Sequence, residues 1–158
     1  SRVGSNPEKN EEIDLNEVLK ELKEVFYRSS EETGAVINIT AMPVIKGNRT
    51  QLFQLFQNLV SNAIKYHGNE APKVDISYTE NEDHYLFQVK DNGIGIDPKF
   101  YNKIFIIFQR LHNREEYEGT GIGLSIVKRH IDYLGGKIWV ESKINIGSTF
   151  YFEIPKNK

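Results

Sequence analysis

An apolar stripe within the segment NRTQLFQLFQNLVSNAIKYHG constrains the fold of this chain more than any other feature. Its residues recur at the i, i+3, i+4, i+7 spacing of one helix face. They are Leu52, Leu55, Phe56, Leu59, Val60, Ala63 and Ile64. A helix with such a continuous apolar face needs a second layer to cover it. The segment KVDISYTENEDHYLFQVKD, which follows, predicts two strands joined by a polar turn at 80–83.

The other expected elements follow from the same periodicities and from the residues that bound them. Asp14 and Glu17 have capping-box spacing, and Asp97-Pro98 is a typical helix start. Because the strands come in hairpin-like pairs, we predict an α+β fold, a two-layer sandwich. Its single sheet is mixed but mostly antiparallel, with the helices packed on one face. The expected helices cover 14–34, 48–68, 98–105 and 121–134, and the remaining strands cover 35–40, 43–47, 137–142 and 147–155.

Composition limits the classes of partner. The 158 residues fit one domain, which we expect to cover 13–158 after a disordered tail or cloning remnant at 1–12. A net charge of -2 gives no reason to expect nucleic acid or an anionic membrane as a partner. The chain has no Cys, which excludes disulfides and thiolate metal sites. No apolar run approaches the roughly 20 residues of a membrane span.

Two asparagines flank the apolar stripe of the 48–68 helix. Asn58 and Asn62 are four residues apart, so their side chains point the same way, and Lys65 lies about one turn further on. Their amide oxygens suit a Mg²⁺ ion that keeps most of its waters and takes substrate phosphates. The alternative is a solvated helix flank.

Two glycine-rich stretches raise a related question. Asp91 precedes Gly93 and Gly95, where backbone could lie against a flat ring while the carboxylate accepts from an exocyclic amine; an Asx-capped turn is the alternative. In GTGIG, at 119–123, unpaired N–H groups at a helix N-terminus favour phosphate; the alternative is a hinge. Neither a Rossmann nor a Walker A motif fits these glycines.

Taken in order, these motifs resemble the ATP-binding domain of sensor histidine kinases. That domain belongs to the Bergerat-fold ATPases, with gyrase, Hsp-type chaperones and mismatch-repair ATPases. The resemblance runs from about Ile13 to Pro155, and it is strongest for bacteriophytochrome and related hybrid-sensor kinases. The matching segments are NLVSNAIKY (N box), DNGIGI (G1), IFIIFQRL (F), GTGIGLSI (G2) and GSTFYF (last glycine box).

The resemblance implies ATP and Mg²⁺ as ligands. Asn62 would hold the metal with Asn58 beside it, Asp91 would accept from the adenine amine, and Arg110 would reach the γ-phosphate. Gyrase-like relatives carry a water-activating Glu where this chain has Asn58, so strong intrinsic hydrolysis is not expected. The segment 112–118 would be the ATP lid. The other nucleotide contacts implied are Lys65, Tyr66, Gly93, Gly95, Ile96, Gly119, Thr120, Gly121, Ile122, Gly123, Leu124 and Thr149.

A histidine kinase also needs an acceptor histidine. None of His67, His84, His112 and His130 has the expected context, a His followed by an acidic residue on a long helix. The resemblance therefore implies a monomeric, cytoplasmic catalytic fragment that phosphorylates a separate dimerisation domain, with a response regulator downstream. Two alternatives are a non-catalytic nucleotide-binding module and an anti-sigma-type Ser kinase. A topoisomerase or chaperone ATPase is disfavoured by Asn58 and the short chain.

Overall fold

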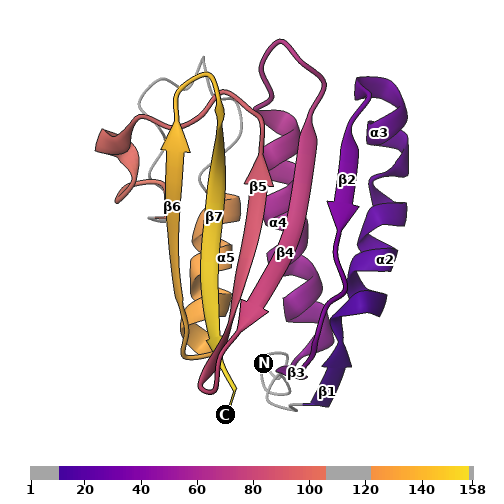
Figure 1. The fold of residues 1–158 in the computed structure, drawn as a ribbon, viewed down its shortest axis with the longest axis vertical. Coiled ribbons are helices and arrows are strands. Elements are labelled where there is room, and N and C mark those ends of the chain that lie inside the picture. The colour runs from indigo at the N-terminus through magenta and orange to yellow at the C-terminus, as the bar shows by residue number, and fades with distance from the viewer. Residues whose placement is uncertain (1–10, 106–121, 157–158) are drawn as a thin grey trace.

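The chain folds as a two-layer α+β sandwich (Figure 1). The computed structural model describes residues 11–105 and 122–156. A five-stranded sheet has the order β2-β4-β5-β7-β6, and only the β2–β4 pair is parallel. The helices cover one face of this sheet, as predicted. The main elements are α2 (Leu15–Val25), α3 (Tyr27–Thr33), β2 (Val36–Ile39), α4 (Arg49–Lys65), β4 (Lys73–Glu80), β5 (His84–Asp91), α5 (Ile122–Tyr133), β6 (Lys137–Lys143) and β7 (Gly147–Pro155).

Three phenylalanines join the two layers. Phe56 of α4 meets Phe87 of β5 and Phe152 of β7 edge-on, with ring centroids 6.0 and 5.5 Å apart. Phe87 and Phe152 stack on each other at 5.0 Å. All three side chains are fully buried. The predicted apolar stripe of α4 is therefore the face that covers the sheet.

The N-terminal region differs from the prediction in two respects. Strand β1 (Glu11–Asp14) pairs antiparallel with β3 (Val44–Gly47), so a two-stranded sheet begins inside the tail expected at 1–12. The expected helix over 14–34 is two helices, because Phe26 leaves the helical conformation with φ −92° and ψ 8°. Phe26 packs against the core, whereas Val25 before it is 53% exposed. Packing of Phe26 turns the chain where the sequence carries no Gly or Pro.

The expected helix over 98–105 was wrong in type and length. Only Pro98–Phe100 forms a helix, a single 3₁₀ turn called η1, capped by Asp97 Oδ1 accepting from Lys99 N. The following residues are held by the sheet: Tyr101 Oη donates to Ser142 O, and Phe105 lies edge-on to Phe150. Beyond η1 the backbone continues in turns, with Ile104 N donating to Phe100 O at 3.1 Å.

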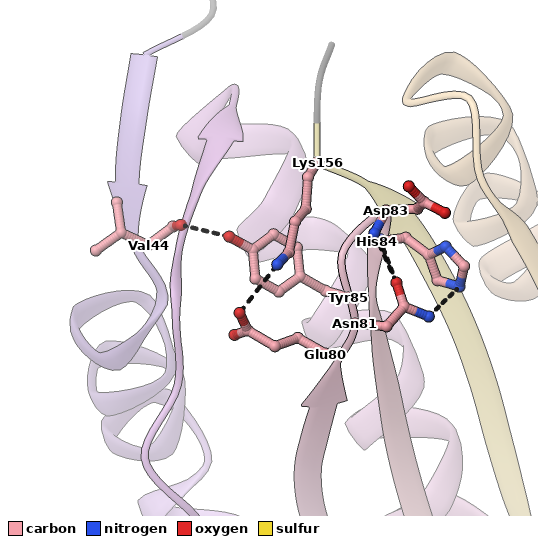
Figure 2. A network of polar contacts seen from close by, with 7 residues as sticks. All are labelled: Val44, Glu80, Asn81, Asp83, His84, Tyr85 and Lys156. Atoms are coloured by element: carbon pink, nitrogen blue, oxygen red, sulfur yellow. Dashed lines mark hydrogen bonds and ion pairs between the residues drawn. The ribbon is translucent and has the colours of Figure 1, made fainter.

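A polar network joins the β4–β5 turn to the end of β7 (Figure 2). Lys156 Nζ lies 3.0 Å from Glu80 Oε2 and 5.2 Å from the centre of the Tyr85 ring. His84 Nε2 lies 3.6 Å from Glu153 Oε2 and 3.4 Å from Asn81 Nδ2. At this end of the sheet, polar side chains thus pair with one another. It lies opposite the end where β5 stops at Asp91.

Candidate functional site

A row of polar side chains interrupts the apolar inner face of the sheet. Val89, Phe150 and Val140 are register partners on β5, β7 and β6, and all three are buried against the helices. Successive side chains of a strand alternate between faces. The next inward position on each of these strands is therefore Asp91, Ser148 and Ser142 respectively, which we call the inner polar row.

Asp91 is fixed by backbone donors. Its Oδ1 accepts from Gly93 N at 2.8 Å, an Asx turn, and from Ser148 N at 3.1 Å. Oδ2 accepts no hydrogen bond from the residues that the structure describes, and it is not among buried unpaired atoms there. Burial raises the pKa of the Asp91 carboxyl, although the two backbone N–H groups act in the opposite direction. The result is an oriented carboxylate with one oxygen open to a donor.

The two glycines after Asp91 are needed by the protein itself. A Cβ on Gly93 would lie 2.5 Å from Tyr66 O, and one on Gly95 would lie 2.3 Å from Lys143 O. Gly95 also has φ +81°. The alternating glycines thus let this turn pack against the end of α4 and the β6–β7 turn. The approach of backbone to a flat ring, inferred from the sequence, is not needed to explain them.

Helix α4 ends beside this turn. Ile94 N donates to Tyr66 O at 3.0 Å, which places the C-cap residue of α4 against the Asp91 turn. Asn58, Asn62 and Tyr66 follow one another at four-residue spacing, so they share one flank of the helix. The Asn58 and Asn62 side chains are half-buried, yet neither forms a hydrogen bond with another described residue. Two amides of this kind are available to a ligand.

Helix α5 runs antiparallel to α4. His130, near the C-terminal end of α5, contacts Gln54, near the N-terminal end of α4, through Nε2 and Oε1 at 3.3 Å. Because both helices rise about 1.5 Å per residue, the first turn of α5 lies level with the Asn58–Asn62 turn. Ile122 and Gly123 form that first turn. The start of α5 therefore lies beside the C-terminal half of α4, and the end of α4 contacts the Asp91 turn.

The remaining predicted residues differ in exposure, and some of them lie outside the described ranges. Lys65 is exposed, with its Nζ 6.0 Å from the centre of the Tyr66 ring, and Leu124 is buried in the core. Ile96 packs against the core, and its N–H donates to Ser142 Oγ at 2.7 Å. Four predicted residues lie outside the described ranges, and so does the expected lid at 112–118; the four are Arg110, Gly119, Thr120 and Gly121.

Thr149 lies apart from the other predicted site residues. It is the register partner of Lys90 and Glu141, and these neighbours point to the sheet face without helices. Its side chain is therefore on the opposite face from Asp91. Ser148, one residue earlier, holds Asp91 instead, and the sequence prediction missed both Ser148 and Ser142. The signal was present: along each strand an apolar alternation changes to a polar residue at its end.

These features define an α+β domain in which half-buried polar side chains lie toward one end of the sheet. A family model described as histidine kinase-, DNA gyrase B- and HSP90-like ATPase matches residues 47–158. The chain belongs to this ATPase family.

Two of the similar curated proteins are a phytochrome and a phytochrome-like protein. Cyanobacterial phytochrome A of Nostoc sp. (strain PCC 7120 / SAG 25.82 / UTEX 2576) is 56% identical over 78% of this chain and 16% of that protein. Phytochrome-like protein Cph1 of Synechocystis sp. (strain ATCC 27184 / PCC 6803 / Kazusa) is 49% identical over 90% of this chain and 19% of that protein. The chain thus spans less than a fifth of the length of these two relatives.

Solved structures agree with the fold. The nucleotide-free catalytic domain of the histidine kinase ThkA has 32% identity and a TM-score of 0.79, over 94% of this chain and 98% of that one. Full-length ShkA in complex with AMPPNP has 27% identity and a TM-score of 0.80, over 93% and 31%. ThkA in complex with the response regulator protein TrrA has 30% identity and a TM-score of 0.73, over 94% and 42%. The predicted family and fold class are confirmed.

Two features are absent from the described residues. No helix among them is both long and apolar enough to cross a bilayer. Within the same ranges, no cluster of three or more His, Asp or Glu side chains is placed to hold a metal ion.

Proposed function

We propose that this chain binds ATP at the end of the sheet where Asp91, the Asn58–Asn62 flank and the start of α5 meet. The observation that carries the proposal is the oriented Asp91 carboxylate, whose Oδ1 is held by two backbone N–H groups while Oδ2 is open. A carboxylate accepts hydrogen bonds only, so Oδ2 suits the exocyclic amine of adenine. Support also comes from ShkA, which was solved with AMPPNP.

The polyphosphate would lie between α4 and the start of α5. The first N–H groups of a helix have no partner within the helix and lie at the positive end of its dipole, so the N-terminus of α5 suits phosphate. Lys65, exposed at the end of α4, adds a compact cation. Arg110, Gly119, Thr120 and Gly121 are part of this proposal from the sequence alone.

The asparagine flank fits a magnesium ion. Asn62 Oδ1 is a neutral hard ligand on a half-buried side chain with no hydrogen-bond partner among the described residues, and Asn58 lies one turn before it. Mg²⁺, when bound, would neutralise charge on the phosphates. The chain's own contribution is to hold the Asn62 amide oxygen beside the phosphates. Position 58 carries an amide and not a carboxylate, so it would not activate water.

The reaction that this site serves is phosphoryl transfer to a histidine. Such transfer depends mostly on positioning and charge stabilisation, which this domain would supply, while the nucleophilic imidazole comes from another domain. We propose a dimerisation domain of the same parent protein as acceptor and a response regulator as the next partner, because ThkA was solved with one. The isolated chain would be a monomer, and the parent's kinase region would be cytoplasmic.

The test combines this chain with a separately produced dimerisation domain from a related phytochrome. With Mg²⁺ and radiolabelled ATP, we expect acid-labile phosphohistidine on the added domain and none when its acceptor His is replaced. An acid-stable phosphoserine would favour the Ser-kinase alternative. Tight ATP binding with no transfer to any supplied acceptor domain would favour a non-catalytic nucleotide module.

A further inference from the structure

Ser142 lies at the β6 end of the inner polar row and is held there by several hydrogen bonds. Its Oγ lies 2.7 Å from Ile96 N, 3.0 Å from Gly147 O and 2.8 Å from Ser148 Oγ. Its backbone is held as well, because Tyr101 Oη accepts from Ser142 N at 2.9 Å and donates to Ser142 O at 3.0 Å. Both the position and the rotamer of Ser142 are therefore fixed by neighbours.

The direction of each hydrogen bond follows from counting protons. A serine hydroxyl has one proton and two lone pairs. Gly147 O can only accept, so the Ser142 proton goes to it. Ile96 N–H can only donate, and it uses one lone pair of Ser142 Oγ. The Ser148 hydroxyl must then donate to the second lone pair, so its proton points at Ser142 and away from any ligand.

This arrangement leaves acceptors alone at the Asp91 end of the row. Asp91 offers Oδ2, and Ser148, whose own N–H is spent on Asp91 Oδ1, offers only hydroxyl lone pairs. A 6-amino purine brings an amine to such a surface. A 6-oxo purine brings a carbonyl oxygen at the same position, where it would meet other acceptors.

We propose that Ser142 is a specificity-determining residue that selects 6-amino over 6-oxo purines by holding the Ser148 hydroxyl proton inward. It acts through Ser148 and does not itself contact the base, so it is a positioning residue. The inference rests on the proposed ATP site and adds to it the reason why a second class of purine is excluded: the row has no donor to offer a 6-oxo group.

The test compares ATP with inosine triphosphate, which carries oxygen in place of the 6-amino group. Calorimetric titration of the unaltered chain should show ATP binding at least about tenfold tighter. Ser142→Ala frees the Ser148 proton to donate outward, so the ratio of the two affinities should fall at least about threefold. Ser142→Thr keeps a hydroxyl and should keep the ratio. A purely structural loss would weaken both nucleotides alike and leave the ratio unchanged.

A double substitution separates the proton from other effects. In Ser142→Ala/Ser148→Ala no hydroxyl remains to be freed, so the preference for ATP should return. If Ser142→Ala does not fold, as judged by its thermal transition, Ser142→Cys serves instead, because its thiol is a weak acceptor. An unchanged ratio in the folded variant overturns this inference alone. If the unaltered chain binds neither nucleotide, the proposed function fails and this inference with it.

Discussion

Stability of the fold and binding of a ligand favour different charge states of Asp91. Its burial disfavours the charged form, yet a charged carboxylate is the stronger acceptor for an amine. Backbone donors on Oδ1 compensate for part of the burial and orient the group. An acid that was selected for stability alone would not be placed beside Val74 and Val89, both fully buried.

Asp91→Asn should weaken ATP binding by more than about tenfold while the fold survives. The amide oxygen can still accept from Gly93 and Ser148, but an NH₂ group would replace Oδ2 and face the adenine amine. The measurement is an ATP titration by calorimetry, with far-UV circular dichroism to confirm folding. An affinity within about threefold of the unaltered chain would remove Asp91 from the base-binding role.

The same substitution should raise the free energy of unfolding at pH 7. Because the folded pKa of Asp91 is raised above its ordinary 3.8, the native state binds the proton more tightly than the unfolded chain. The contribution of Asp91 to stability is thus fully present below about 3.8 and is lost as pH rises through the folded value. Urea unfolding at pH 7 and at pH 3.5 should show the advantage of the Asp91→Asn variant shrinking at the lower pH.

The control for this pH effect is Asp83→Asn, on the exposed β4–β5 turn. It should not reproduce the pattern. A gain in stability for Asp91→Asn that is equal at both pH values would contradict burial of the charge as its cause.

Asn62→Ala should weaken binding of ATP with Mg²⁺ more than binding of ATP with a chelator. The side chain is a metal ligand in this account, so its loss matters only when the metal is present. ATP titrations of the variant and of the unaltered chain, with Mg²⁺ and with a chelator, give the loss of affinity in each condition. Asn69→Ala, in the exposed loop after α4, is the matched control. Equal losses with and without metal would take Asn62 out of the metal site.

At the level of elements, the site depends on close backbone contacts of the Asp91 turn with the end of α4 and with the β6–β7 turn. The Asp91 turn touches the end of α4 through Gly93 and the β6–β7 turn through Gly95. Asn145 N donates to Ile94 O at 2.7 Å, which closes the second of these contacts. Bulk at either glycine would displace Asp91 from the row.

Gly95→Ala should cost about 2–4 kcal/mol of stability, because it adds a backbone clash to an unfavourable φ of +81°. Gly68→Ala is the matched control: its Cβ would meet only Ile94 Cγ2, at 3.9 Å. Denaturant midpoints of the two variants should differ clearly. Equal stabilities would show that the turn can move away from β6 without loss.

The sequence predicted the elements whose periodicity was complete in itself. Helix α4 and the β4–β5 and β6–β7 pairs appear at the expected places, because alternation and helical spacing report burial directly. The failures share a different cause: the helix break at Phe26, the single turn at Pro98–Phe100 and strand β1 depend on partners distant in sequence. Local propensity carries no information about such partners.

The candidate site was predictable to the same extent. Asp91 and the asparagine pair stand out as residue types that are unusual at their positions. Ser142 and Ser148 do not, because a serine at a strand end is common, and only the register of three strands brings them beside Asp91. The sequence did not predict that Thr149 lies on the other face for the same reason. A shift of one residue along a strand moves a side chain to the opposite face of the sheet.

On the scale of the whole molecule, the two ends of the sheet have different roles. The end with the β4–β5 turn carries the Lys156 and His84 contacts. Toward the other end lie Asp91 and the half-buried Asn58 and Asn62, whose side chains form no hydrogen bond with another described residue. Between these ends, the rings of Phe56, Phe87 and Phe152 join the helix layer to the sheet. In the proposed function, such a domain would present a nucleotide to an acceptor domain at the end that carries Asp91.

The most direct measurement is an NMR titration of the ¹⁵N-labelled chain with ATP and Mg²⁺. The account predicts saturable shifts of the amides of Gly93, Gly95 and Ser148 and of the Asn62 side-chain amide, with Asn81 and Lys156 at the far end unmoved. Well-folded material whose spectrum does not change at millimolar nucleotide, or changes only at the far end, would contradict it.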